Sequence, residues 1–375
     1  MMKRLLIVTM LLLSWSQPSR LPAEKLVITT PNNPVLANDN LAAAAIDMVQ
    51  GSSAIKCAVV MTGDDQLVLH ATTDLAHQTN VAERYPERRR DDGSFQVFDF
   101  LLEEVQSLHL KHPEPNGDEQ TPRPLLPSLR ISSLAEVLSL LAPLEQSTGN
   151  TIRVMVEGKQ AWRHRREQKQ LGAAIVQHLA DFKLLQKTPP PIIASYDPEF
   201  LKALDQTMPA QFRQQVLLYQ FIDFNDGIEH QQREGNQWLP YDYQWLLTTF
   251  GLKLVSDYAD GLGFRPEFVY NQDGQPQRPT YFENARLLGL SLLLYPVDHL
   301  LDMDQPGEIE SFITKYLFSA ALDGLITSHP QKIKAIIKKK TAAQSVERGP
   351  AKTPIERFLE KIKQEQTEPE AIVKP

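Results

Sequence analysis

The stretch SAIKCAVVMTGDDQLVLHATTDLAHQT, residues 53–79, carries the clearest indication of the fold. It predicts a strand over residues 55–61, a Gly-Asp-Asp turn and a second short strand over residues 66–70. Glycine and aspartate tolerate the tight or left-handed backbone that a hairpin turn needs. Because side chains alternate along a strand, Lys56 and Ala58 point to the same face of the first strand. The stretch therefore predicts a hairpin.

The composition is that of a soluble globular protein. The chain has 375 residues, of which 42% are hydrophobic and 23% charged, enough for one large barrel or two ordinary domains. Its net charge of −7 argues against a nucleic-acid binder that uses a broad basic face. The single cysteine, Cys57, excludes an intrachain disulfide framework and a multi-cysteine zinc site, and we expect it to be buried.

The first residues predict a targeting segment. Met-Met-Lys-Arg precedes an apolar run over residues 5–13, which is too short to cross a bilayer comfortably. Residues 1–23 are therefore interpreted as a signal peptide for export. An uncleaved N-terminal anchor is the alternative, because the sequence around Ala23 only loosely matches a cleavage site.

Strand-like and helical segments alternate between residues 24 and 340. This alternation is typical of an α/β protein with a (β/α)8 TIM barrel, with the hairpin as a small insertion near the top. The pattern alone also allows a doubly wound parallel sheet. Barrel strands are expected over residues 25–29, 55–61, 151–157, 192–196, 216–221, 261–264, 290–297 and 325–327. Helices are expected over 39–50, 98–108, 134–144, 171–185, 198–208, 243–258, 280–288, 308–322 and 330–340, and polar connections over 80–93, 111–127, 160–170 and 225–240.

Residues 341–375 are expected to lie outside the barrel. The segment 341–354 has the composition of a linker, and residues 355–365 predict a short amphipathic helix before a polar tail. This helix is expected to dock on the barrel or on a protein partner.

The hairpin stretch resembles that of bacterial periplasmic glycerophosphodiester phosphodiesterases, in the phospholipase C-like superfamily. The family reads Ile-x-Glu-x-Asp, then Thr-x-Asp-Asp, then Val-x-His-Asp. The resemblance extends from residue 25 to about residue 334 and implies the TIM barrel and a periplasmic or exported location. The matching residues are Thr62, Asp64, Asp65, Val68, His70, Arg84-Tyr85-Pro86-Glu87-Arg88, Asp99-Phe100, Tyr241-Asp242-Tyr243-Gln244-Trp245, Tyr258-Ala259-Asp260-Gly261-Leu262-Gly263 and Asp323-Gly324-Leu325.

Several positions that carry the family's chemistry are changed. The family's first strand ends in His-Arg-Gly, whereas this chain has Thr30, Pro31 and Asn32. The family's Glu-x-Asp pair, which holds a divalent cation, is replaced by Lys56 and Ala58. A hard cation needs several oxygen ligands. The resemblance therefore implies a degenerate site with no cofactor, and Ca²⁺ or Mg²⁺ only if hydrolysis survives.

Four residues remain as candidates for the site. The resemblance places Glu157 at the family's third metal ligand and His70 at its second catalytic histidine, both as remnants. We expect the Lys56 ammonium to replace the cation and pair with Glu157; the alternative is that it extends to solvent. Lys159 and Lys56 are the candidate ligand-binding residues. The other histidines of polar segments, His77, His109, His112 and His164, are expected at the surface.

Two functions follow from these residues. The first is an exported, catalytically degenerate protein that binds a ligand or supports a partner. The alternative is an active phosphodiesterase that hydrolyses glycerophosphodiesters to an alcohol and glycerol 3-phosphate, with His70 acting alone and Asp39 or Asp197 helping Glu157 to hold a metal. The expected ligands are a glycerophosphodiester, glycerol phosphate or a lipid headgroup. The basic residues Arg163, Arg165 and Arg166 could attract an acidic lipid headgroup; the alternative is that they form a solvated loop.

Overall fold

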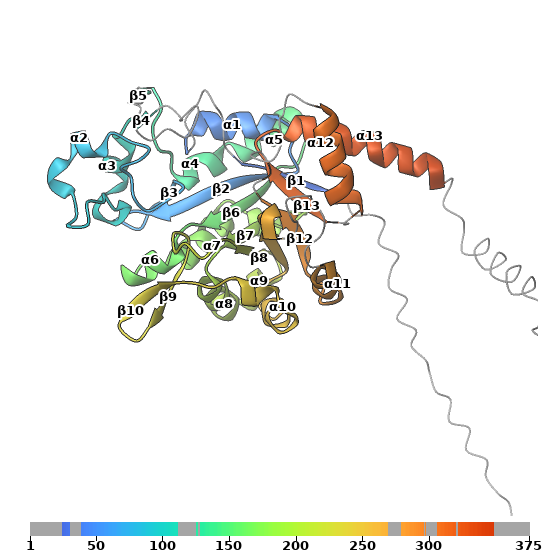
Figure 1. The fold of residues 1–375 in the computed structure, drawn as a ribbon. Helices are drawn as coiled ribbons and strands as arrows, with labels where there is room; N and C mark the ends of the chain where they lie inside the picture. The colour runs from blue at the N-terminus through green and yellow to red at the C-terminus, as the bar shows by residue number, and fades with distance from the viewer. Residues whose placement is uncertain are drawn as a thin grey trace, which may run out of the picture.

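Eight parallel strands close into a barrel in the computed structural model (Figure 1). The structure describes residues 25–30, 39–111, 125–126, 128–268, 279–295, 297, 306–319 and 322–348. Each strand pairs with the next along the chain, and the last returns to the first, so the TIM barrel is confirmed and an open doubly wound sheet is excluded. The barrel strands are β1 (Leu26–Thr29), β2 (Ala54–Met61), β6 (Arg153–Gly158), β7 (Ile192–Ser195), β8 (Leu217–Ile222), β11 (Gly261–Phe264), β12 (Ser291–Leu294) and β13 (Gly324–Thr327).

The expected hairpin is also present. Strand β3 (Leu67–Leu69) pairs antiparallel with β2, with Val60 opposite Val68. The turn is held by the Thr62 hydroxyl, which donates to Asp64 Oδ1 at 2.6 Å, and Asp65 adopts a left-handed φ of 61°. The turn residues therefore fix the register of the hairpin as predicted.

Helices surround the barrel, and several are shorter than the sequence pattern predicts. The predicted helices over 98–108, 134–144 and 243–258 are each divided or shortened, because a cap or a loop interrupts them. The main helices are α1 (Leu41–Val49), α3 (Leu102–Gln106), α4 (Leu134–Ser139), α5 (Leu141–Thr148), α7 (Leu171–Asp181), α8 (Pro198–Thr207), α9 (Ala210–Arg213), α10 (Thr249–Ser256), α11 (Pro279–Leu287), α12 (Pro306–Ile313) with the π-helical turn Thr314–Ser319, and α13 (Pro330–Arg348).

The predicted polar connections contain regular structure, so four loop predictions are wrong in part. Their elements are short and largely solvated, which removes the apolar periodicity on which a sequence prediction depends. Helix α13 likewise continues eight residues past Lys340, into the predicted linker. The unpredicted elements are α2 (Val81–Arg84), η1 (Pro86–Arg88), α6 (Ala161–Arg166), the paired strands β4 (Leu110–Lys111) and β5 (Leu125–Leu126), and the hairpin of β9 (Gln231–Glu234) and β10 (Gln237–Pro240).

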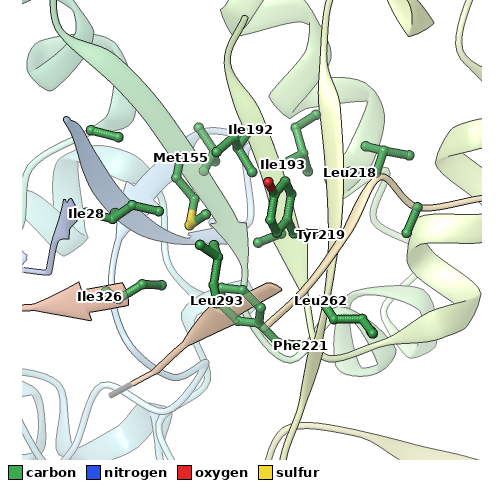
Figure 2. Packing of buried hydrophobic residues seen from close by; sticks show 14 of the residues in the cluster. Ile28, Met155, Ile192, Ile193, Leu218, Tyr219, Phe221, Leu262, Leu293 and Ile326 are labelled. Atoms are coloured by element: carbon green, nitrogen blue, oxygen red, sulfur yellow. The ribbon is translucent and has the colours of Figure 1, made fainter. Parts of the chain in front are cut away.

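Apolar side chains fill the barrel below its mouth (Figure 2). Tyr219 and Phe221 of β8 lie beside β11, where their register partners are Gly261 and Gly263. A Cβ atom at Gly263 would lie 2.4 Å from the Phe221 ring, so glycine is required there for the ring to fit. The layer beneath the mouth is therefore closely packed with apolar side chains. The polar side chains of the candidate site lie above it, toward the mouth.

The structure tests the prediction about the cysteine but not the two predictions about the termini. Cys57 is buried on β2, as predicted. The targeting segment 1–23 and the predicted helix 355–365 lie outside the described residues. Among the described residues, no helix has the length and apolar character needed to span a bilayer.

Candidate functional site

A buried ion pair joins two neighbouring barrel strands at the mouth. Lys56 on β2 points into the barrel, and its ammonium contacts Glu157 Oε2 on β6. The two side chains are 4% and 0% exposed, so Lys56 does not extend to solvent. Lys56 Nζ also donates to the Tyr295 hydroxyl at 3.1 Å and lies 4.5 Å from the centre of its ring. The expected pairing of Lys56 with Glu157 is therefore present.

Lys159 extends this pair into a row of alternating charges. Its ammonium donates to Glu157 Oε1 at 3.3 Å and contacts Glu229 Oε1, which comes from the loop after β8. The Lys159 side chain is only 8% exposed. Lys56, Glu157, Lys159 and Glu229 thus form one cluster with two positive and two negative charges.

The pKa shifts in the cluster follow from burial and from these contacts. Burial disfavours the charge on Lys56, but attraction to Glu157 outweighs it and raises the pKa of Lys56. Burial likewise opposes ionised Glu157, yet Lys159 and Lys56 together hold its pKa below the ordinary value. For Glu229 the effect of burial is larger than the attraction to Lys159, so the pKa of Glu229 is raised. Glu229 is therefore the least firmly charged member of the cluster.

The residues at the mouth do not fit the divalent cation that the resemblance implies. Both oxygens of Glu157 already accept from ammonium groups, Lys56 on one side and Lys159 on the other. A cation placed against Glu157 would face those two positive charges, and Ala58 beside it offers only a methyl group. Among the residues that the structure describes, no group of three or more His, Cys, Asp or Glu side chains is arranged to hold a metal ion.

His70 is fully buried at the end of the β3 segment, at the mouth. Its Nδ1 lies 2.6 Å from the carbonyl oxygen of Thr72, which can only accept, so Nδ1 carries the proton. Nε2 has no hydrogen-bond partner among the described residues. The ring is therefore held in place through Nδ1, while Nε2 remains available to a ligand.

Asp39 lies close to His70. The sequence suggests Asp39 as a possible additional metal ligand beside Glu157. It is 5% exposed, has a left-handed φ of 67°, and accepts a hydrogen bond from the backbone of Ala71. Burial raises its pKa, while His70 and Lys56 pull it down. Within the described part of the chain, Asp39 Oδ2 has no hydrogen-bond partner.

Asp197 caps helix α8 and is not a member of the Lys56 cluster. Its Oδ1 accepts from the backbone of Glu199 at 2.9 Å and caps α8, while Oδ2 contacts Arg165. His230 Nδ1 lies 3.5 Å from the same carboxylate. These contacts satisfy Asp197, so the proposed help in holding a metal is not supported by its geometry.

His164 was expected at the surface, and that prediction is wrong. The side chain is 1% exposed. Its Nε2 accepts from the backbone N–H of Met61 at 3.0 Å, and Nδ1 donates to the Gln160 carbonyl at 3.2 Å. Burial lowers the pKa of His164 to about 4. His109 is half-buried, His77 is exposed as expected, and His112 lies outside the described residues together with Pro31 and Asn32.

The sequence did not identify two residues that contact the lysines of the cluster, Glu229 and Tyr295. Glu229 lies in a loop without periodicity, and no sequence signal identifies it. Tyr295 could have been found, because it directly follows barrel strand β12, where mouth residues are expected.

Comparison with known proteins yields one family. The profile of the glycerophosphoryl diester phosphodiesterase family matches residues 39–332. A glycerophosphodiester phosphodiesterase of Treponema pallidum (strain Nichols) is 30% identical over 230 residues, which is 59% of this chain and 65% of that protein. The corresponding protein of Haemophilus influenzae is 28% identical over 236 residues, 61% of this chain and again 65% of the relative. The chain thus matches slightly less than two thirds of either relative's length.

Solved structures share the fold at low identity. A glycerophosphoryl diester phosphodiesterase from Silicibacter pomeroyi DSS-3 has a TM-score of 0.58 at 17% identity, covering 84% of this chain and 94% of that one. An Oleispira antarctica phosphodiesterase, solved with the product sn-glycerol-3-phosphate, has a TM-score of 0.54 at 15% identity, covering 84% and 96%.

Proposed function

Because the chain belongs to the glycerophosphoryl diester phosphodiesterase family, we propose that it is a non-catalytic member that binds a phosphate-bearing ligand at the barrel mouth. One observation carries the proposal: both oxygens of Glu157 are held by lysines, at the place where the family resemblance puts a metal. The mouth that remains offers two ammonium groups to an anion, and a cation beside Glu157 would face both of them.

The ligand class follows from the two lysines. Lys56 and Lys159 are both buried, so an anion that reaches them is desolvated and strongly attracted. The Oleispira antarctica relative in fold was solved with sn-glycerol-3-phosphate. Glycerol phosphate, glycerophosphodiesters and lipid headgroups that share the phosphate are therefore the ligands to test.

Glu229 controls access to the anion site. Its carboxylate contacts Lys159 as a ligand phosphate would, and its Oε2 has no hydrogen-bond partner within the described residues. The loop that carries it exposes Phe224 and Ile228, which are 46% and 54% exposed. A bound phosphate takes the place of Glu229 on Lys159, and the loop moves outward with it.

The second candidate function is that of an active phosphodiesterase. The observation that favours it is the position of His70, which is buried at the mouth with one ring nitrogen unpartnered among the described residues. This nitrogen, Nε2, could accept a proton from a substrate, and Asp39 lies beside the ring. The reaction also needs a group that stabilises the developing phosphate charge, and Lys56 and Lys159 are the described cations of the cluster that could supply it.

One pair of measurements separates the two functions. Titration calorimetry with sn-glycerol-3-phosphate and glycerophosphocholine measures binding, and release of glycerol phosphate measures hydrolysis. The proposal expects saturable binding that Lys159→Gln removes, with no product formed. Product formation that His70→Ala abolishes would instead establish the enzyme.

The location and the domain limits are proposed on sequence grounds. We propose export to the periplasm, with residues 1–23 removed as a signal peptide or retained as an inner-membrane anchor, and the barrel over residues 24–340. Residues 341–375 form the tail, whose segment 355–365 is proposed to contact the barrel or a protein partner. N-terminal sequencing of the exported protein distinguishes removal from retention.

A further inference from the structure

Helix α13 carries a charge opposite to that of the whole chain. Between Pro330 and Val346 it has five lysines and no acidic residue, although the chain has a net charge of −7. Ile333 and Ile337 are 0% and 8% exposed and fix one side of the helix to the barrel. The lysines Lys332, Lys338 and Lys339 are exposed on the remaining surface. A carboxylate also faces this surface: Glu310 of α12 lies 3.6 Å from Lys339 and 3.2 Å from Lys340.

A cavity of about 450 Å³ lies between α13 and the beginning of β1. Val27, Ala335 and Ile337 contribute apolar lining, whereas Lys25, Lys334 and Lys338 place amines around it. The Lys25 ammonium donates to the Leu322 carbonyl at 2.7 Å, which holds it at this position. Amines around an apolar hollow suit an anionic amphiphile, because one part binds phosphate and the other receives hydrocarbon.

The chain itself leads from this cavity to an apolar segment. Lys25, which lines the cavity, directly follows residues 1–24, and these contain the apolar run 5–13. Nucleic acids and acidic proteins would also bind the lysines electrostatically. They would not fill an apolar cavity, however, nor bind the apolar run 5–13 that precedes Lys25 in the chain. The combination favours a membrane surface.

We propose that the cationic surface of α13, together with Lys25, docks on an anionic lipid surface. Clusters of four to eight basic residues on an amphipathic helix bind anionic lipids, at about 1 kcal/mol for each lysine near the surface. The α6 helix and the β9–β10 hairpin lie at the other end of the molecule from the free end of α13 (Figure 1). Docking through α13 therefore leaves the barrel mouth open to water.

The test is vesicle co-sedimentation of the full chain, with vesicles of phosphatidylcholine alone and of phosphatidylcholine mixed with phosphatidylglycerol. The variant K332Q/K338Q/K339Q removes three exposed lysines but keeps Lys334, whose ammonium donates to the Gly51 carbonyl. The expected result is a loss of affinity for the anionic vesicles of up to about a hundredfold. Binding to neutral vesicles should be unchanged, because residues 1–24 are the same in both proteins.

A matched control, K202Q/R233Q/K253Q, removes three cations elsewhere: half-buried Lys202 on α8, and exposed Arg233 on β9 and Lys253 on α10. It should bind anionic vesicles like the wild type, and both variants should keep the wild-type melting temperature. Equal losses in the two triple variants, or wild-type binding by the α13 variant, would overturn the proposal. So would tighter, α13-dependent binding to polyglutamate or to an RNA oligonucleotide than to the vesicles.

Discussion

Lys56 on β2 and Glu157 on β6 are paired inside the barrel, with their side chains 4% and 0% exposed. In the pairing of β2 with β6, Ala58 lies opposite Glu157 and Lys56 lies opposite Met155. The Lys56 side chain therefore extends along the barrel to reach the carboxylate. A charge this deeply buried requires its partner, because water cannot replace it.

Lys56→Ala should therefore lower the free energy of unfolding by about 3–5 kcal/mol, since it leaves Glu157 with only Lys159 as a counter-charge. The double variant K56A/E157Q should recover much of the loss because no unpaired charge remains. Urea unfolding of the three proteins measures this. If the single variant is as stable as the wild type, the pairing does not stabilise the fold.

Restoring the family's two carboxylates should restore cation binding. In the variant K56E/A58D, three carboxylates meet at the mouth, so it should be less stable than the wild type without metal. Saturating Ca²⁺ should then raise its stability by about 3 kcal/mol when the ion is a hundredfold above its Kd. Melting in Ca²⁺ and in EDTA provides the measurement, with K56Q/A58N as the uncharged control. The wild type should show no calcium-dependent change.

Glu229→Gln should increase the affinity for sn-glycerol-3-phosphate by about tenfold, because the ligand no longer competes with a carboxylate for Lys159. Calorimetry compares this variant with Glu234→Gln, which changes an exposed residue of the nearby β9 strand. Unchanged affinity in Glu229→Gln would mean that Glu229 does not cover the anion site.

Asp47 should make the protein less stable at neutral pH. Burial raises its pKa to about 7, from an ordinary value of 3.8. Well below pH 3.8 the side chain is protonated in both states and has no effect on stability, whereas between pH 3.8 and about 7 mainly the unfolded chain ionises. The penalty grows through pH 7 to at most about 4 kcal/mol. Asp47→Asn should therefore stabilise the protein at pH 8 and leave its stability at about pH 3 nearly unchanged, as chemical unfolding at both pH values would reveal.

Gly263→Ala should destabilise the barrel by about 1–3 kcal/mol, because its Cβ would meet the Phe221 ring at 2.4 Å. Gly235→Ala is the control for a glycine with free space around it, although its φ of 60° carries a small backbone cost. The comparison of melting temperatures separates crowding inside the barrel from backbone strain.

The strand pattern allows the barrel and the family resemblance selects it, and the same resemblance places Lys56 beside Glu157. Buried parallel strands are continuous apolar runs, and a charge at an inward position of such a run must meet a partner from a neighbouring strand. Nothing comparable locates Glu229, whose position depends on the path of a solvated loop. His164 was misplaced because its basic neighbours on α6 suggested a solvated segment, although Trp162 and His164 turn the other side of that helix inward.

The Lys56–Glu157 pair also restricts the evolutionary routes that remain open to this lineage. A single change of Lys56 to glutamate would bury two carboxylates side by side, and a single change of Ala58 to aspartate would add another beside Glu157. Each intermediate is destabilised before any ion can compensate for it. Converting this mouth into a cation site therefore requires both substitutions together.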